Sequence, residues 1–401
     1  MNKKISLLAL AICLLLTLFS PVLAQAQETI TILDSHAQVE FPTRLSFSLS
    51  AQSDVDIVDI RLCYVIDRAG FADVTSEAYV RFVPGTKVDV DWTLDMIRIG
   101  GLPPGSNVKY WWTVKNAAGN GAETPPSALQ FNDNRHQWRS ITEDKITIHW
   151  YEGNETFAAE LMTTAQQALN ILAADTGAQL VKPAGIYIYA STQDLVGALI
   201  YPQEWTGGVA FTRFGIISIG ISPANLAWGK RAMTHELAHL VVHQMTLNPY
   251  IDLPTWLDEG LAMYAEGLPG PEFTSRLHQA VIGDTLISVR SLSSPFSANA
   301  DEAILSYAES QSLVEFLIGT YGQTKMLELL NTFSQGSGYD EALNKVYGFD
   351  MDGLDAAWRD YVSAKYRVAT ARNEAEPILA GILPAPAGLL SGLKPAFKYG
   401  I

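Results

Sequence analysis

Hydrophobic and polar residues alternate along the first part of the chain, which predicts short β-strands. The alternation is clearest at residues 44–49, 61–66, 78–82 and 87–92. Because successive side chains of a strand point to opposite faces, each of these runs predicts a strand with one buried face. Glycine and proline residues such as Pro84-Gly85 and Gly100-Gly101 separate the runs. About seven strands in about 100 residues favour an antiparallel all-β sandwich over residues 27–131.

The end of this β region carries a more specific pattern. Residues 102–114 contain a Pro-Pro-Gly turn that leads into the aromatic run Tyr110-Trp111-Trp112. This stretch resembles the penultimate-strand corner of a fibronectin type III-like or immunoglobulin-like (Ig-like) domain. Residues 132–143 are polar and lack periodicity, so they predict a linker to a second domain.

The pattern changes within residues 144–370. Short apolar runs at 145–151, 185–189, 208–211 and 216–221 predict strands, and residues 156–174 and 191–199 predict helices. From residue 223 onward, apolar residues recur every three to four positions at 227–245, 255–266, 301–321, 324–333, 340–347 and 351–368. The sequence therefore predicts a multidomain protein, in which an α+β domain with a helical C-terminal subdomain follows the sandwich.

Both ends of the chain differ from these domains. Lys3 and Lys4, the apolar run 5–19 and the small residues up to Ala26 predict a signal peptide over residues 1–26, with an uncleaved anchor as the alternative. Export to a bacterial-type cell envelope or extracellular space follows from a cleaved peptide. The apolar tail 371–401 contains Pro377, Pro384, Pro386 and Pro395, which leaves packing on the body, flexibility, or weak association with a membrane or cell wall open.

Charge and cysteine content narrow the class of protein. The chain has 42 acidic and 27 basic residues, a formal charge of −15, and it lacks the dense basic run typical of nucleic-acid binding. Nucleic acid is therefore excluded as an expected partner. Cys13 lies in the signal segment, so Cys63 is the one cysteine left in the mature chain. Core area or a metal, rather than an internal disulfide, must then stabilise the exported protein.

The segment His235-Glu236-Leu237-Ala238-His239 carries candidate chemistry. Positions i and i+4 of a helix lie one turn apart on one face, so both imidazoles can bind one metal ion. Glu236, rotated by about 100° from His235, can hold a water at that metal without binding it. Met233, Leu237, Leu240 and Val241 form an apolar stripe that predicts docking of this helix on the sheet.

A second motif follows at residues 254–266, with Trp256-Leu257-Asp258-Glu259-Gly260 inside it. Together with the HExxH segment, it resembles the gluzincin zinc metallopeptidases, most closely the bacterial peptidase MA-like domain with its thermolysin-like catalytic fold, over about residues 143–370. The resemblance implies one Zn²⁺ per chain. It also implies that His235, His239 and Glu259 are the metal ligands, that Glu236 is the general base, and that Tyr307 stabilises the oxyanion. For Tyr307, a core aromatic at a helix interface is the alternative.

Neighbouring residues have less certain roles. His243 continues the i+4 spacing, but three successive turns point poorly at one ion, so we expect it near the ligands or on the helix surface. Asp258 and Glu266 are candidates to orient an imidazole, with solvent exposure as the alternative. Gly260 allows close helix approach. Residues 207–211 resemble the gluzincin edge strand that pairs with a peptide substrate, but lack the glutamate with which related aminopeptidases bind a free amino terminus.

The sequence thus predicts a secreted or envelope-associated zinc peptidase that hydrolyses peptide bonds in a peptide or protein substrate, and an endopeptidase is favoured. The alternative is a non-enzymatic binding or envelope-assembly protein that retains a zinc-bound peptidase fold. The intact Glu236 disfavours that alternative, because a structural zinc site needs no base beside the metal.

Overall fold

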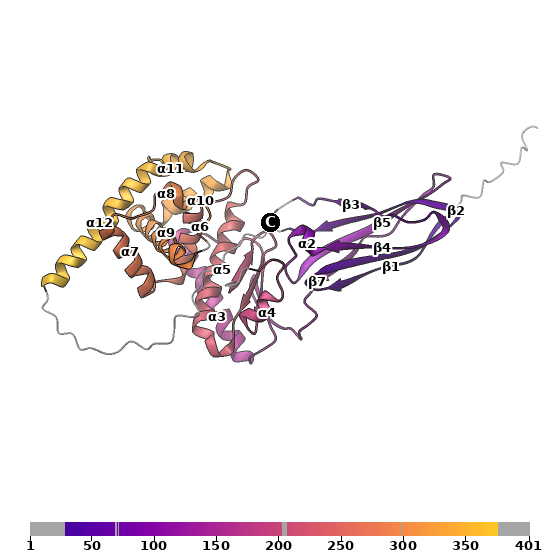
Figure 1. Cartoon of the computed structure of the whole chain (residues 1–401), viewed down its shortest axis with the longest axis horizontal. Coiled ribbons are helices and arrows are strands. Elements are labelled where there is room, and N and C mark those ends of the chain that lie inside the picture. The colour runs from indigo at the N-terminus through magenta and orange to yellow at the C-terminus, as the bar shows by residue number, and fades with distance from the viewer. Residues whose placement is uncertain (1–28, 69, 71, 203–206, 298, 376–401) are drawn as a thin grey trace, which may run out of the picture.

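The computed structural model describes residues 29–375 except 69, 71, 203–206 and 298. The predicted signal peptide and residues 376–401 of the predicted tail lie outside the described residues. The chain is elongated, with a β region at one end, a second sheet in the middle and helices at the other end (Figure 1). The expected order of a β-sheet region followed by a helical C-terminal domain is therefore confirmed. No helix in the described part combines the length and apolarity needed to cross a membrane.

The N-terminal region is built around one long strand. Its elements are β1 (Ile30–Glu40), β2 (Arg44–Ile66), β3 (Ser76–Tyr79), β4 (Gly85–Asp95), α2 (Met96–Ile99), β5 (Ser106–Asn116), β6 (Gly121–Glu123) and β7 (Ser127–Phe131). The first half of β2 pairs with β1 and β4, and its second half pairs with β3 and β5, all antiparallel. The strand β2 thus joins two sets of neighbours.

The continuity of β2 differs from the sequence prediction, which placed separate strands at residues 44–49 and 61–66. No glycine or proline interrupts this segment, so nothing in it forces a turn. Its pairing register shifts between Gln52 and Ile57 instead, where the strand changes neighbours. Alternate side chains on both halves are buried, including Phe47 and Leu62, and Cys63 is a buried free cysteine as predicted.

The second sheet has the strand order β11-β12-β10-β9-β8. The strands are β8 (Arg139–Glu143), β9 (Ile146–Trp150), β10 (Ala184–Tyr189), β11 (Gly208–Phe211) and β12 (Ile216–Gly220). Strands β9, β10 and β12 are parallel, whereas the two edge strands β8 and β11 run antiparallel to their neighbours. Strand β8 falls within the segment expected as a linker. Its side chains are mostly exposed, so the sequence carries no buried face that could predict it.

Two different layers cover the two faces of this sheet. Ile186, Ile188 and Ile219 belong to the core shared with the helices. Tyr187, Tyr189 and Ile216 point to the other side and belong to the core of the N-terminal region. The contact is close, since a Cβ at Gly105 would collide with the Tyr187 side chain. The N-terminal region therefore covers one face of the second sheet.

The helices make up the rest of the molecule. They are α3 (Glu155–Thr176), α4 (Thr192–Val196), α5 (Leu226–Thr246), α6 (Thr255–Glu266), α7 (Pro271–Gly283), α8 (Val289–Leu292), α9 (Ala300–Tyr321), α10 (Gln323–Ser334), α11 (Tyr339–Tyr347) and α12 (Met351–Ala375), with a 3-10 turn at Pro223–Asn225. The long periodic segments predicted these helices correctly, but α7 and α8 were not predicted. Helix α12 extends into the first residues of the predicted tail.

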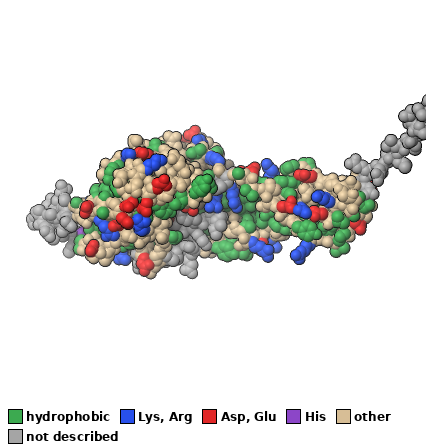
Figure 2. Space-filling view, turned by 90° about the horizontal axis from the view of Figure 1, so that it is seen from above, with side chains coloured by type: hydrophobic (Ala, Val, Ile, Leu, Met, Phe, Trp, Pro, Cys, Tyr) green, Lys and Arg blue, Asp and Glu red, His purple; other side chains and the backbone are tan. Residues whose placement is uncertain are grey.

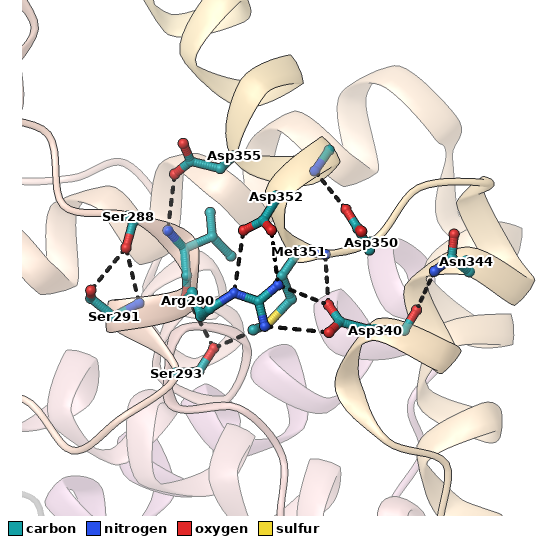
Figure 3. A network of polar contacts seen from close by, with 12 residues as sticks. Ser288, Arg290, Ser291, Ser293, Asp340, Asn344, Asp350, Met351, Asp352 and Asp355 are labelled. Atoms are coloured by element: carbon teal, nitrogen blue, oxygen red, sulfur yellow. Dashed lines mark hydrogen bonds and ion pairs between the residues drawn. The ribbon is translucent and has the colours of Figure 1, made fainter.

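Charged side chains tie the short helix α8 to the C-terminal helices. Arg290 forms ion pairs with Asp340 of α11 and Asp352 of α12, and the backbone N–H of Val289 donates a hydrogen bond to Asp355 (Figure 3). All three acidic side chains are therefore paired, and they hold α8 against the ends of α11 and α12. On the face shown in Figure 2, Lys and Arg side chains lie scattered among acidic ones.

Candidate functional site

Helix α5 carries three of the predicted site residues at the centre of the molecule. Its apolar stripe of Met233, Leu237, Leu240 and Val241 is fully buried, as predicted. The anchored stripe holds His235 and His239 side by side, with their ring centroids 4.8 Å apart. Both imidazoles are buried, with relative exposures of 4% and 6%. The helix therefore presents two nitrogen ligands at one point.

Helix α6 brings Glu259 to the same point. Gly260 lies where α6 crosses α9, and a Cβ there would collide with the backbone carbonyl oxygen of Ser310. The close helix approach predicted for Gly260 is thus confirmed. It places the Glu259 carboxylate, only 2% exposed, beside the two imidazoles of α5.

The three candidate ligand atoms form a compact triangle. His235 Nε2 and His239 Nε2 are 3.1 Å apart, and Glu259 Oε2 lies 3.5 Å from each. A tetrahedral Zn²⁺ with bonds of about 2.0–2.1 Å places its ligands about 3.3–3.4 Å apart. The spacing of the three atoms fits that requirement.

Two carboxylates fix the orientation of the imidazoles. Glu266 lies 2.6 Å from His235 Nδ1, and Asp258 lies 2.9 Å from His239 Nδ1. A carboxylate accepts a hydrogen bond, so Nδ1 of each ring carries a proton, and in the neutral ring Nε2 is then the nitrogen with the lone pair. The expectation that Asp258 and Glu266 orient the imidazoles is confirmed.

This arrangement tests whether the residues suit a metal. The two Nε2 lone pairs and Glu259 Oε2 face one another, and Oε2 is buried without a hydrogen-bond partner. Three electron-rich atoms at this distance repel one another unless a proton or a metal cation lies among them. Two histidines and one carboxylate also match a catalytic zinc site with an open fourth position. The residues therefore fit Zn²⁺.

His243 lies beside this triangle rather than in it. Its Nε2 is 3.1 Å from Asp258 Oδ2, so Asp258 bridges His239 and His243. His239, His243 and Asp258 are also close enough to share a metal, but their facing atoms already pair with one another. Burial favours the neutral form of Asp258, yet the two histidines outweigh it and hold the pKa of Asp258 well below its usual value.

Glu236 points from α5 toward the edge strand β11. The backbone N–H of Ala210 donates a hydrogen bond to its carboxylate, and a Cβ at Gly208 would lie only 2.8 Å from Glu236 Oε1. Gly208 thus leaves room for the acid. Burial raises the pKa of Glu236 to about 7. A carboxylate with this pKa can both accept and return a proton near neutral pH.

A cavity of about 110 Å³ lies next to His235 and Glu236. Tyr307 of α9 forms part of its wall, is 4% exposed, and packs edge-on against Phe296 with ring centroids 5.1 Å apart. The structure thus brings all five predicted site residues to one place. Sequence reasoning missed Trp228 and Arg231, which also line the cavity. They lie seven and four positions before His235, a helical spacing that could have revealed them.

Comparisons with known proteins give a family and a number of structural likenesses. The sequence profile of the Peptidase MA superfamily matches residues 164–364, about half of the chain. No curated protein matches the sequence significantly. An M1 zinc metallopeptidase from Deinococcus radiodurans is similar over 90% of this chain and 97% of its own, with 14% identity and a TM-score of 0.35.

A second solved structure is a catalytically inactive OgpA from Akkermansia muciniphila in complex with an O-glycopeptide substrate. It is similar over 27% of this chain and 30% of its own length, with 10% identity and a TM-score of 0.21. This chain therefore spans less than a third of that protein.

Proposed function

The chain belongs to the Peptidase MA superfamily, and from that premise we propose that it is an exported zinc endopeptidase. Membership makes it a zinc metallopeptidase hydrolase, as its two motifs predict. The observation that carries the proposal for the site is the triangle of His235, His239 and Glu259, with its unpartnered buried carboxylate oxygen.

In this proposal, His235, His239 and Glu259 hold one Zn²⁺. When bound, the metal supplies Lewis acidity, which lowers the pKa of a water molecule at its open position and polarises the scissile carbonyl. Glu266 and Asp258 keep both imidazoles in the tautomer that binds a metal, because each accepts a hydrogen bond from Nδ1–H.

Glu236 acts as the general base. Its carboxylate is held between α5 and β11 by the Ala210 N–H, next to the cavity. There it takes a proton from the attacking water and passes it to the nitrogen of the leaving group. Tyr307, in the wall of the same cavity, donates a hydrogen bond to the carbonyl oxygen as that oxygen gains negative charge.

The free edge of β11 receives the peptide. Strand β11 pairs with β12 alone among the described strands, and the backbone N–H of Gly220 donates to Gly207 O. Because hydrogen-bonding direction alternates along an antiparallel pair, the backbone groups of Gly208 and Ala210 point away from β12. The Ala210 N–H is bonded to Glu236, so the groups offered to a peptide are those of Gly208 and the Ala210 carbonyl. An extended peptide can add to that edge by β-augmentation and bring its scissile bond to Glu236.

The absence of a carboxylate on β11 supports cleavage inside a peptide rather than at its amino terminus. Its residues Gly208–Phe211 include no carboxylate to bind a free amino terminus. The features at residues 1–26 support export. For the N-terminal region, we infer a fibronectin type III-like or Ig-like sandwich, which is supported by the way that the two halves of β2 pair with different neighbours.

The proposal is tested with a mixed peptide library. The zinc-loaded protein and its Glu236→Gln variant are incubated with the library, and products are identified by mass spectrometry. We expect internal cleavages that disappear in the variant. Removal of single residues from the amino terminus would overturn endopeptidase action, and an absence of products from wild-type protein with one bound zinc would overturn general peptidase activity.

A further inference from the structure

One basic side chain in the wall of the cavity takes no part in the proposed reaction. Arg231 lies on α5, four positions before His235, and therefore on the same face of the helix. It is exposed, and it makes no ion pair or hydrogen bond with any residue that the structure describes. This differs from its neighbour Lys230, which pairs with Glu160 of α3 at 2.6 Å.

Other polar groups of the cavity are already engaged, although Gln311 Oε1 is buried without a hydrogen-bond partner. Glu266 is 2.6 Å from His235 Nδ1, and the side-chain amide of Gln311 donates to the carbonyl oxygens of Met263 and Gly267. The Gln311 amide must keep this orientation, because a flip would turn its oxygen toward two carbonyl oxygens. Arg231 is therefore the charged group of the wall that is available to a ligand.

The remaining walls are apolar and close together. Trp228, Met263 and Phe273 line them, and a Cβ at Gly207 would lie 3.0 Å from the Trp228 ring. The volume of about 110 Å³ is below the roughly 150 Å³ that accommodates a benzene ring. This space suits one side chain on an apolar stem, and it adjoins a larger cavity of about 790 Å³ that shares Glu266, Phe273 and Gln311 with it.

We propose that this cavity selects a substrate residue that carries a carboxylate, and that Arg231 is the specificity-determining residue that binds it. The inference rests on the proposed peptidase function and adds a substrate class to it. Arginine presents a planar fork of donors that matches a carboxylate in two parallel hydrogen bonds. The carboxylate comes either from an Asp or Glu side chain or from the free carboxyl terminus of a short peptide.

The net negative charge of the chain and the carboxylate of Glu266 both repel a substrate carboxylate, but each repulsion is weaker than the pairing with Arg231. The net charge of −15 is screened over about 8–10 Å at ordinary salt, so it affects the rate of encounter more than binding in the cavity. Glu266 lies in the same wall, but its carboxylate is already bonded to His235. Direct contact with Arg231 therefore outweighs both the net charge and Glu266.

The test compares peptide pairs that differ only by Glu or Gln at one position near the cleaved bond. We expect wild-type protein to cleave the Glu peptide about 10- to 100-fold more efficiently at one such position, since hydrogen bonds to charged groups contribute that much. Arg231→Gln removes the preference, and Arg231→Glu turns it toward Lys at the same position. Lys230→Gln, which removes the same charge one residue away, keeps it.

Two further arms identify the source of the carboxylate and separate this inference from the general function. If a side chain is the group bound, the Glu peptide is preferred and amidation of the peptide terminus changes nothing; if the free terminus is bound, the Glu and Gln peptides are cleaved equally and amidation lowers cleavage of both in wild type but not in Arg231→Gln. Binding of the same peptides to the Glu236→Gln variant, measured by calorimetry, requires no turnover. Equal affinity there for the Glu, Gln and terminally amidated peptides, or discrimination in Arg231→Gln that equals that of wild type, overturns the inference, whether or not wild-type protein cleaves.

Discussion

The N-terminal β region and the peptidase region bury different kinds of polar side chain. In the β region, the buried residues Ser53, Ser106, Asn116 and Thr124 are neutral, and their side chains pair with one another or with the backbone. Asn116 donates to Ser53 Oγ, Ser106 Oγ donates to a carbonyl oxygen, and Thr124 Oγ1 accepts from a backbone N–H. The peptidase region buries titratable groups, namely His235, Glu236, His239, Asp258, Glu259 and Glu309.

This difference indicates that the buried polar groups of the β region contribute to stability, whereas those of the peptidase region serve the candidate site. Burial of a charged group costs free energy unless a partner compensates it, so a core selected for stability alone avoids such groups. Around α5 and α6 they are instead concentrated in a small volume with perturbed pKa values, which is typical of a functional site. We therefore expect substitutions in the two regions to act on different observables.

The largest expected effect is on activity, in Glu236→Gln. Loss of the general base should lower kcat by about 10²- to 10⁴-fold. The melting temperature should stay the same or rise, because the variant buries a neutral amide in place of an acid whose pKa is raised by burial. Peptide hydrolysis and thermal denaturation of the same preparation measure both. A variant that loses activity and also melts much earlier would contradict the separation.

Metal removal should act on the peptidase region alone. A zinc concentration about 1,000 times the dissociation constant stabilises a folded protein by about 4 kcal/mol. We expect chelation to remove this increment and the activity together, and Glu259→Gln to lose most of the increment.

Calorimetry with and without zinc measures that increment. The matched control is Glu315→Gln on α9, a surface residue paired with Lys365, which should keep the full increment. An undiminished increment in Glu259→Gln would remove Glu259 from the ligand set.

In the β region, a core truncation should give the reverse pattern. Leu62 is fully buried on β2, so Leu62→Ala should lower the free energy of unfolding by about 2–5 kcal/mol. The kcat of the protein that remains folded should not change. Denaturant titration and hydrolysis rates below the transition measure the two quantities. Val83→Ala, at a residue 87% exposed, serves as the control and should change neither.

The smallest expected effect is a pH dependence from Glu309. Burial raises its pKa to about 8, and its carboxyl group accepts the N–H of Ile287. A raised pKa means that the native state favours the protonated acid. This contribution to stability is fully present below about pH 4.5 and is lost as the pH rises through about 8.

Glu309→Gln should flatten that decline, by on the order of 2 kcal/mol between pH 5 and 8. Urea denaturation at several pH values measures it. Glu315→Gln again provides the control on the same helix, and a parallel pH profile in wild type and Glu309→Gln would exclude Glu309 as the cause.

The sequence predicted the site better than its surroundings. His235, Glu236 and His239 follow from helical geometry, and Glu259 from a motif whose resemblance to a known family is confirmed by the superfamily match. Each of the two motifs lies within one short segment, so the local sequence is enough to recognise it. The cavity wall combines α5, α6, α7 and α9, and no local pattern records which distant residues meet there.

Other features were missed for physical reasons of the same kind. Strand β8 has mostly exposed side chains, so its sequence does not alternate. Helix α7 follows the Gly-Leu-Pro-Gly-Pro turn at 267–271, whose breakers suggested a loop. Tyr187 and Tyr189 read only as strand residues, because the partner that buries them lies about eighty positions earlier in the chain.

The packing of the N-terminal region over one face of the second sheet has an evolutionary consequence. Tyr187, Tyr189 and Ile216 would all face water in a gene product that began at β8, and a contiguous apolar patch of that kind promotes aggregation. Recombination that separates the two halves should therefore be selected against, and a relative without this β region must supply another cover for the sheet. We therefore expect the two halves to be inherited as one unit, although only one of them carries the candidate metal site.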